Sequence, residues 1–313
     1  MKGNISIPEI VSIAKENNYS HVFFVNSPIT AIVTRLITEK YNLQSDKIIV
    51  VSIRDTDTAI IDFLTIIPNK NLFDKILFKL FKYNLIGKRI LHSIKQKSKE
   101  FIIYSAWYYD EVKESINSKN CKGHIYFEEG QLSNRSIIPI SIEEMLKENK
   151  SDLYLEPNLR KNYFLDTAKA YIGISPKVFP QISQKKRYIL DNYSDVLKYY
   201  KPKLIGIKNV GLTCAERRIN GKDWRIMIDT ILAAMSNHGV IKLHPSFSYN
   251  KKKIDLIKSY TELKSGNKAK ICSFDTIIEI EMIHEPKNLI GPLTSLREYS
   301  VLFGSTFQEI KLY

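Results

Sequence analysis

The stretch Gly123-His124-Ile125-Tyr126-Phe127-Glu128-Glu129-Gly130 decides how this chain is interpreted. Its apolar middle predicts a short buried strand, and two carboxylates and a glycine follow directly. In open α/β sheets, ligands bind in the crevice outside the carboxyl ends of the strands, so we expect these acids to face a ligand. The glycine allows backbone or substrate to approach closely. The stretch therefore predicts a sheet strand that ends in a functional loop.

Three other apolar runs lead into polar or small residues in the same way. Residues 21–25 end at Asn26-Ser27-Pro28, residues 239–243 end at His244-Pro245, and residues 289–290 lead into Gly291-Pro292-Leu293-Thr294-Ser295. Such loops suit ligands, because a loop that opens a helix presents backbone N–H groups to an anion. Together with the acidic pair, they form a candidate site whose parts are spread over most of the chain.

The spacing of apolar residues predicts alternating strands and helices. We expect strands at 21–25, 47–53, 101–104, 124–127, 204–207, 239–243, 270–273 and 289–290, and helices at 7–17, 29–41, 109–116, 224–235, 253–260 and 296–303. This alternation predicts an α/β protein of two doubly wound, Rossmann-like domains that face each other across a cleft. The polar residues 149–159 serve as the expected linker, so the domains are predicted at 1–158 and 159–313.

The composition limits the classes of function. The chain has 313 residues, with 47 Lys and Arg against 33 Asp and Glu, and its net charge of +14 is expected to attract polyanions. Its three cysteines are scattered, which is typical of free thiols in a reducing compartment. We find neither a signal-peptide pattern nor an apolar run long enough to span a membrane, so we expect a cytoplasmic protein.

Residues 69–99 form an amphipathic, basic region with nine Lys or Arg and one acid, Asp74. A solvated basic face over a core explains this pattern, and so does a helix that lies on anionic lipid. The second explanation places the protein at the inner face of the cell membrane. Nucleic-acid binding is not expected, because no recognised motif accompanies the charge.

The acidic pair has the chemistry of a general base. Adjacent carboxylates repel each other, and both repulsion and restricted solvation raise the pKa of a carboxyl group. Because neighbouring strand residues point to opposite faces, only one of Glu128 and Glu129 is expected to reach a substrate. The alternative is an exposed acidic turn. A second acidic motif, Asp55-Thr56-Asp57, is explained more simply by helix capping before residues 59–67 than by metal binding.

The candidate residues in the second half suit a phosphate. His244, held stiff before a proline, can hydrogen-bond or protonate a leaving phosphate, and Lys242 adds charge. Thr294 and Ser295 offer hydroxyl and N–H groups at a helix start. Glu279 can bind a ribose diol. Each has a structural alternative. His244 can be a strand-end histidine whose hydrogen bonds are made within the protein, Thr294 and Ser295 can simply cap a helix, and Glu279 can be a surface acid on a half-exposed strand.

In this order, these motifs resemble those of the GT-B type bacterial sialyltransferases that build capsules and lipooligosaccharide termini. That family shares an acidic pair followed by glycine, then a His-Pro and a serine-rich phosphate loop. Here the matching residues are Glu128-Glu129-Gly130, His244-Pro245 and Thr294-Ser295. Residues 277–280 and the Asn26-Ser27-Pro28 loop are similar to its ribose-binding and N-terminal segments. One departure is Thr294, where the family usually has a first serine.

The resemblance implies an inverting transfer of sialic acid from CMP-sialic acid to a sugar hydroxyl, without metal or further cofactor. It implies that Glu129 is the base, with Glu128 as the alternative, and that His244 acts on the departing CMP. It also implies that Thr294 and Ser295 hold the phosphate and that Glu279 binds the ribose. The first domain would bind the acceptor, expected to end in galactose, and the second would bind the nucleotide. Two rival hypotheses are a GT-B enzyme with another nucleotide-sugar donor and a non-catalytic basic module that binds membrane or polyanion.

Overall fold

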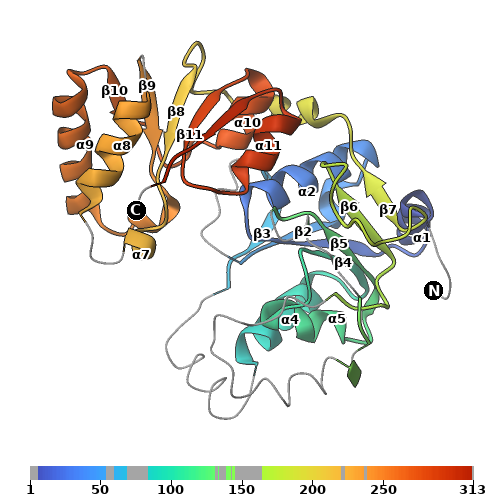
Figure 1. Ribbon diagram of the computed structural model, residues 1–313. Helices are drawn as coiled ribbons and strands as arrows, with labels where there is room; N and C mark the ends of the chain where they lie inside the picture. Colours follow the sequence, from blue (N-terminus) through green and yellow to red (C-terminus); the bar gives the residue numbers. More distant parts are fainter. Residues whose placement is uncertain are drawn as a thin grey trace. The chain divides into compact units, whose positions relative to one another are not determined.

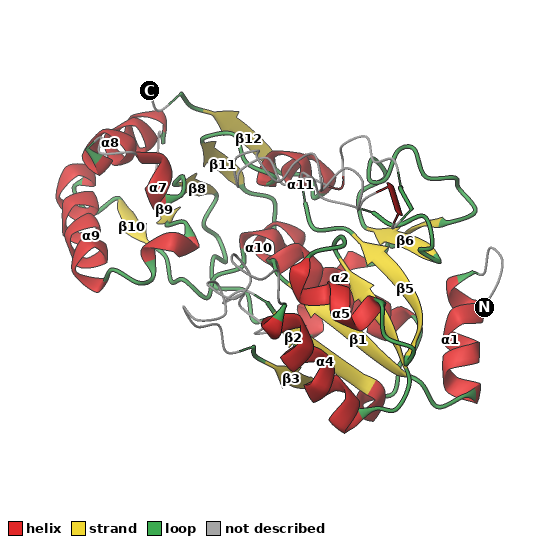
Figure 2. Ribbon diagram, turned by 90° about the horizontal axis from the view of Figure 1, so that it is seen from below, coloured by secondary structure: helices red, strands yellow, loops and turns green. Residues whose placement is uncertain are grey.

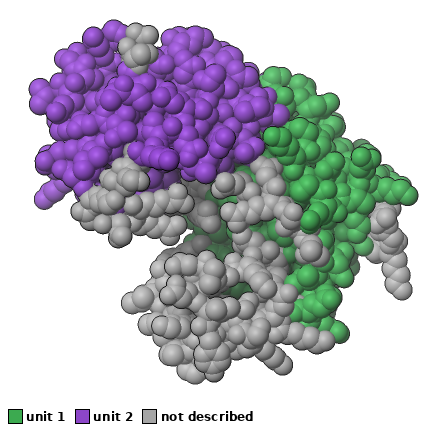
Figure 3. Space-filling view, in the orientation of Figure 1, with its two compact units in different colours: residues 1–195 green, residues 196–313 purple. Residues whose placement is uncertain are grey.

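The computed structural model describes residues 6–53, 60–68, 84–130, 133, 139–141, 143–144, 164–219, 223–235 and 238–311. The chain divides into two compact units, residues 1–195 and 196–313 (Figure 3). Three features that the sequence analysis singled out lie outside the described residues. They are the Asp55-Thr56-Asp57 motif, the first half of the basic region (69–83) and the polar segment 149–159.

The first unit is built on a parallel sheet with the strand order β3-β2-β1-β4-β5-β6-β7. Its strands are β1 (Ser20–Val25), β2 (Ile48–Ser52), β3 (Leu64–Ile66), β4 (Phe101–Ser105), β5 (Cys121–Phe127), β6 (Ala170–Gly173) and β7 (Arg187–Ile189). Every residue of the central strands β1 and β4 is buried. A strand covered on both faces reads as a continuous apolar run, which is how residues 21–25 and 101–104 appear in the sequence.

Helices cover both faces of this sheet (Figures 1 and 2). They are α1 (Ile7–Glu16), α2 (Pro28–Lys40), α4 (Leu85–Lys97) and α5 (Asp110–Ile116). Figure 1 shows α4 and α5 on the face opposite α2. Ile90, Ile94 and Val112 of α4 and α5 pack there on Val22 and Phe24 of β1.

The second unit repeats the plan with a smaller parallel sheet of order β10-β9-β8-β11-β12. Its strands are β8 (Asn209–Leu212), β9 (Gly239–Lys242), β10 (Ala269–Ile271), β11 (Asn288–Gly291) and β12 (Thr306–Glu309). Its helices are α7 (Glu216–Ile219), α8 (Trp224–Ala234), α9 (Lys251–Ser265), α10 (Ile278–His284) and α11 (Leu296–Leu302). Apolar residues of α8 and α9 pack on one face of this sheet, and Figure 1 shows α10 and α11 on the other. The predicted α/β class with two Rossmann-like sheets is confirmed.

Several local predictions differ from the structure. The unit boundary lies after Asp195 and not after residue 158, because β6 and β7 extend the first sheet. The strand predicted at 204–207 is a turn in which Gly206 has a φ of +73°, and the true strand, β8, begins at Asn209. Residues 59–67 contain the strand β3 where helix capping implied a helix.

Among the described residues, no helix is both long enough and apolar enough to cross a bilayer.

Candidate functional site

Because all strands of the first sheet are parallel, the loops that follow them emerge at one edge. Two of the sequence-predicted loops meet there. Ser27 is the N-cap of α2, and its Oγ accepts the N–H of Thr30 at 3.2 Å. The same Oγ donates to the carbonyl oxygen of Glu129, which lies after β5, at 3.3 Å. The structure therefore brings the Asn26-Ser27 loop and the acidic pair together across 102 residues of sequence.

Asn26 is buried at this edge. Its backbone N–H donates to the Thr30 hydroxyl at 3.0 Å. Its side-chain Oδ1 is buried and has no hydrogen-bond partner among the described residues. Since buried polar atoms are nearly always paired, this carboxamide is a fitting place for a ligand hydroxyl or a water molecule.

The two acids of the pair have different environments. Glu128 is fully buried, and its Oε2 accepts the N–H groups of Ile174 at 2.7 Å and of Ser175 at 3.0 Å. These donors belong to the loop after β6, so the carboxylate fixes the end of that neighbouring strand. Glu128 thus has a structural environment, and we retain Glu129 as the candidate base.

Glu129 is half-buried and begins a tight turn. Its N–H donates to Ser133 Oγ at 3.0 Å, and the Ser133 N–H donates to the Gly130 carbonyl at 3.0 Å. Gly130 has a φ of +141°, a conformation that side chains disfavour, which explains the glycine after the acids. Ser133, which the sequence analysis did not identify, therefore sets the geometry of this turn.

In the second unit, the loops after β8 and β9 meet at the carboxyl edge of the second sheet. The N–H of His244 donates to Thr213 Oγ1 at 2.8 Å. His244 Nδ1 accepts the N–H of Ser246 at 3.1 Å and lies 3.0 Å from the Ser246 hydroxyl. A backbone N–H can only donate, so Nδ1 carries no proton and the neutral ring is protonated at Nε2. The imidazole is exposed and is held as an N–H donor.

Pro245 begins the short 3-10 turn Pro245–Phe247, which places Ser246 beside the imidazole. Ser246 Oγ also accepts the N–H of Glu216 at 2.9 Å. Neither Thr213 nor Ser246 was predicted as part of the site. The available signal was weak: a hydroxyl residue directly after a strand, and one two positions after the histidine.

Lys242 and Glu279 are linked electrostatically. Lys242 Nζ donates to the carbonyl oxygens of Ser273 at 3.0 Å and Phe274 at 2.6 Å, so it fixes the loop after β10. Glu279 lies in the first turn of α10 and not on the half-exposed strand considered from the sequence. Burial raises the pKa of the Glu279 carboxyl group, and the charge of Lys242 partly offsets this effect.

The third loop of the second unit begins at Gly291, the last residue of β11. A Cβ on Gly291 would lie 2.7 Å from Leu212 Cβ, so only glycine permits this approach of β11 to β8. Thr294 Oγ1 accepts the N–H of Leu296 at 3.1 Å, which is ordinary capping. Ser295 precedes α11, and its side chain makes no capping hydrogen bond.

The structure thus gathers the predicted residues into two groups, one in each unit. The first contains Asn26, Ser27, Glu129 and Gly130, and the second contains Lys242, His244, Pro245, Glu279, Gly291, Thr294 and Ser295. Among the described residues, no three acidic, histidine or cysteine side chains are grouped as metal ligands would be.

Solved structures share this architecture. The complex of S. aureus MnaA with UDP aligns at 12% identity over 94% of this chain and 79% of the other, with a TM-score of 0.57. A Listeria monocytogenes protein assigned as a UDP-N-acetylglucosamine 2-epimerase aligns at 12% identity over the same shares, with a TM-score of 0.53. The calicheamicin glycosyltransferase CalG4 aligns at 9% identity over 93% and 79%, with a TM-score of 0.48.

Neither a protein-family model nor a curated protein sequence matches the chain. At identities of 12%, the structural likeness establishes the fold alone. The chain has a GT-B fold, as the sequence resemblance implied.

Proposed function

We propose that this protein is an inverting, metal-independent sialyltransferase that transfers sialic acid from CMP-sialic acid to a glycan hydroxyl of a capsule or lipooligosaccharide. The observation that carries the proposal is the separation of the acidic pair. Glu128 is buried and bound to two backbone N–H groups, whereas Glu129 is half-buried at the carboxyl edge beside Ser27. The less buried of the two, Glu129, is the carboxylate that we assign as the base, in line with the motif resemblance.

In this mechanism, Glu129 accepts the proton of the acceptor hydroxyl as its oxygen forms a bond to the anomeric carbon. The bond from that carbon to the phosphate oxygen of CMP breaks, and the electron pair leaves with CMP. Asn26 and Ser27 orient the acceptor, and the glycine at 130 gives it room. A galactose-terminated glycan is the acceptor we expect.

The second unit stabilises the leaving group. The Nε2–H of His244 donates to the phosphate oxygen on which negative charge develops, or transfers its proton to it. Ser295 and the loop from Gly291 hold the phosphate, and Thr294 caps the helix behind it. Glu279 binds the ribose, while Lys242 and Pro245 shape the loops around the histidine.

The test is a donor panel with a defined product. The full-length protein is incubated with galactose-terminated oligosaccharides and CMP-sialic acid, UDP-galactose or UDP-N-acetylglucosamine, with and without a chelator. We expect release of CMP alone, unaffected by the chelator, and a product whose anomeric configuration by NMR is inverted relative to the donor.

Transfer from a UDP-sugar instead would contradict the choice of donor and support the alternative GT-B enzyme. That outcome has a structural precedent, because the S. aureus neighbour binds UDP. If no donor releases its nucleotide and calorimetry detects no binding of CMP, the enzymatic proposal is contradicted. That result would support the non-catalytic basic module.

A further inference from the structure

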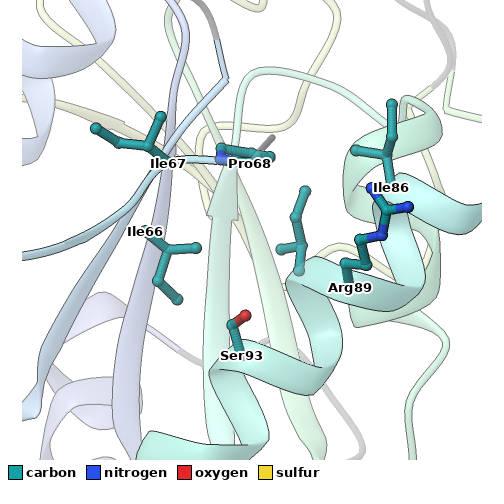
Figure 4. Close-up of a pocket in the computed structure, with 7 residues that line it drawn as sticks. Ile66, Ile67, Pro68, Ile86, Arg89 and Ser93 are labelled. Carbon is teal, nitrogen blue, oxygen red and sulfur yellow. The ribbon is translucent and has the colours of Figure 1, made fainter. Parts of the chain in front are cut away.

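A cavity of about 160 Å³ lies between the edge strand β3 and helix α4 (Figure 4). Ile66, Ile67 and Pro68 line it from the strand side, and Ile86, Arg89, Ile90 and Ser93 line it from the helix. Figure 4 shows Ile66, Ile67 and Pro68 on one wall. Ile86, Arg89 and Ser93 of the helix are on the other. An apolar cavity of about 150 Å³ in another protein holds a benzene molecule, so this cavity accepts roughly six carbon atoms.

The cavity has an exposed apolar rim. Ile67, which follows β3 and lines the cavity, is 77% exposed. An exposed apolar side chain at the edge of a cavity whose lining is mostly isoleucine and proline is a candidate interaction site.

The helix that forms one wall of the cavity is basic. Helix α4 contains Lys88, Arg89, Lys95 and Lys97 and no acidic residue. Arg89 lines the cavity and is exposed, so a cation lies at its mouth. Glu114 of α5 is on another side of α4, since a Cβ on Gly87 would lie 2.8 Å from Glu114 Cγ, and positions 87 and 89 are on nearly opposite sides of a helix.

We propose that this cavity binds an acyl chain of an anionic lipid and that the basic face of α4 lies on the headgroups of the same membrane. The two chemistries match the two parts of one ligand: aliphatic walls for the chain, and Arg89 with its neighbouring lysines for the acidic headgroup. Nucleic acid fits less well, because its bases bind by stacking on aromatic side chains and the seven lining residues include none.

The position of the cavity relates it to the rest of the unit. β3 is parallel to β1 and β5, so Ile67 and Pro68 emerge at the same edge of the sheet as Asn26 and Glu129. A membrane bound there would lie at the edge where an acceptor glycan is expected. The lipid site itself does not depend on which reaction the protein catalyses.

The experiment measures binding of the full-length protein to lipid vesicles by sedimentation. Vesicles of phosphatidylcholine alone are compared with vesicles that also contain phosphatidylglycerol, at low and at physiological salt. We expect about tenfold stronger binding to the anionic vesicles at physiological salt, and a larger difference at low salt.

Three variants distinguish vesicle binding by the cavity from attraction by the surface charge in general. Arg89→Glu reverses the charge at the mouth, Ser93→Phe fills the cavity, and Ile67→Asp makes its exposed rim polar. Each is expected to weaken binding about tenfold or more. The matched controls in the second unit are Lys258→Glu and Leu263→Asp, which make the same changes at exposed positions of α9 and are expected to bind as the wild type does. Circular dichroism establishes that each variant is folded.

Three results would overturn the proposal. The first is no preference of the wild type for anionic vesicles. The second is wild-type binding by folded Ser93→Phe and Ile67→Asp, which would assign the effect to surface charge alone. The third is a single-stranded oligonucleotide that binds as tightly as the vesicles and competes with them, which would identify a nucleic-acid surface.

Discussion

Each unit has one fully buried and one half-buried glutamate close together in the sequence. In the first, Glu128 is buried on the backbone N–H groups of Ile174 and Ser175, and its neighbour Glu129 is half-buried. In the second, Glu281 is buried and accepts from the Tyr200 hydroxyl and from the N–H groups of Lys203 and Leu204. Its neighbour on the same helix, Glu279, is half-buried.

The comparison separates acids that build loops from acids that are available to a ligand. A buried carboxylate that accepts from backbone N–H groups holds the loop that carries them, and removing it costs stability. A half-buried carboxylate has an exposed part that a ligand can contact. The units differ in what lies near the half-buried acid: the Ser27 hydroxyl and the adjoining Asn26 carboxamide in the first, and the Lys242 ammonium group in the second.

The first prediction tests what the second unit contributes to catalysis. His244→Asn keeps an acceptor for the Ser246 N–H but removes the donor at Nε2. We expect kcat for CMP-sialic acid to fall about 100-fold, the usual loss when one charge-stabilising donor is removed. The control is His284→Asn, an exposed histidine on α10. Equal activity of both variants would remove His244 from the mechanism.

The second prediction contrasts the units in acid. Burial lowers the pKa of His21 to about 4 and, together with Lys169 and Lys186, that of His124 to about 3. Histidines 238, 244 and 284 of the second unit are exposed. Between pH 6.5 and about 4 the unfolded first unit binds more protons than the folded one, so its stability falls as pH falls through this window.

The expected loss is on the order of 3 kcal/mol per buried histidine by pH 4. Amide hydrogen exchange at pH 6.5 and pH 4, corrected for intrinsic rates, measures it separately in each unit. His21→Asn should reduce the pH dependence of the first unit, and His238→Asn should not. A second unit that loses stability equally would contradict this contrast.

The third prediction concerns the buried carboxylates. Glu128→Gln keeps an amide oxygen for its two backbone donors but loses the negative charge that strengthens those hydrogen bonds, and Glu281→Gln also places an NH2 group against donors; we expect each to lower the unfolding free energy by about 1–3 kcal/mol. Urea denaturation measures this loss, with the exposed Glu262→Gln as the control. Two variants as stable as the control would show that these carboxylates do not build their loops.

The smallest expected effect tests whether Glu279 binds the ribose of the donor. Glu279→Gln is expected to raise KM for CMP-sialic acid about tenfold with kcat unchanged, because one hydrogen bond to the ribose is weakened in ground and transition states alike. In the wild type, KM should rise as pH falls, because protonation of this carboxyl group, whose pKa burial raises, removes an acceptor. A fall in kcat at constant KM would instead place Glu279 in the chemical step.

The sequence predicted several of the strands that are buried on both faces, although it missed β6, whose four residues are all buried. Residues 21–25 and 101–104 have only one reasonable interpretation, since continuous apolar runs of this length form central strands. The edge strands β7 and β12 were missed because they are short and partly exposed. β7 is Arg-Tyr-Ile and β12 is Thr-Phe-Gln-Glu, and neither has a fully buried residue.

The apolar run at residues 204–207 led to a wrong strand prediction because it is apolar without being a buried strand. Ile205 is 67% exposed, and Gly206 turns the chain with a positive φ while its N–H donates to Glu285. Only the partner 79 residues away makes this segment a turn. The pattern of residues 204–207 alone does not reveal this contact with Glu285.

The candidate site shows the same limit. Strand alternation predicts that Glu128 and Glu129 point to opposite faces, and the position of the pair at a strand end was foreseen. Which acid is buried depends on the N–H groups of Ile174 and Ser175 on another strand's loop, and the turn depends on Ser133. Motifs identify residue types at strand ends, whereas roles follow from tertiary partners.

The most direct test of the account measures transfer from CMP-sialic acid and stability together in two isosteric variants of adjacent residues. For Glu129→Gln we predict a fall in kcat/KM of about 100- to 10,000-fold, the usual loss of a general base, with the urea midpoint of the wild type. For Glu128→Gln we predict a lower urea midpoint, with most of the activity retained where the protein is folded. Loss of activity in Glu128→Gln at full stability, with an active Glu129→Gln, would contradict the central claim.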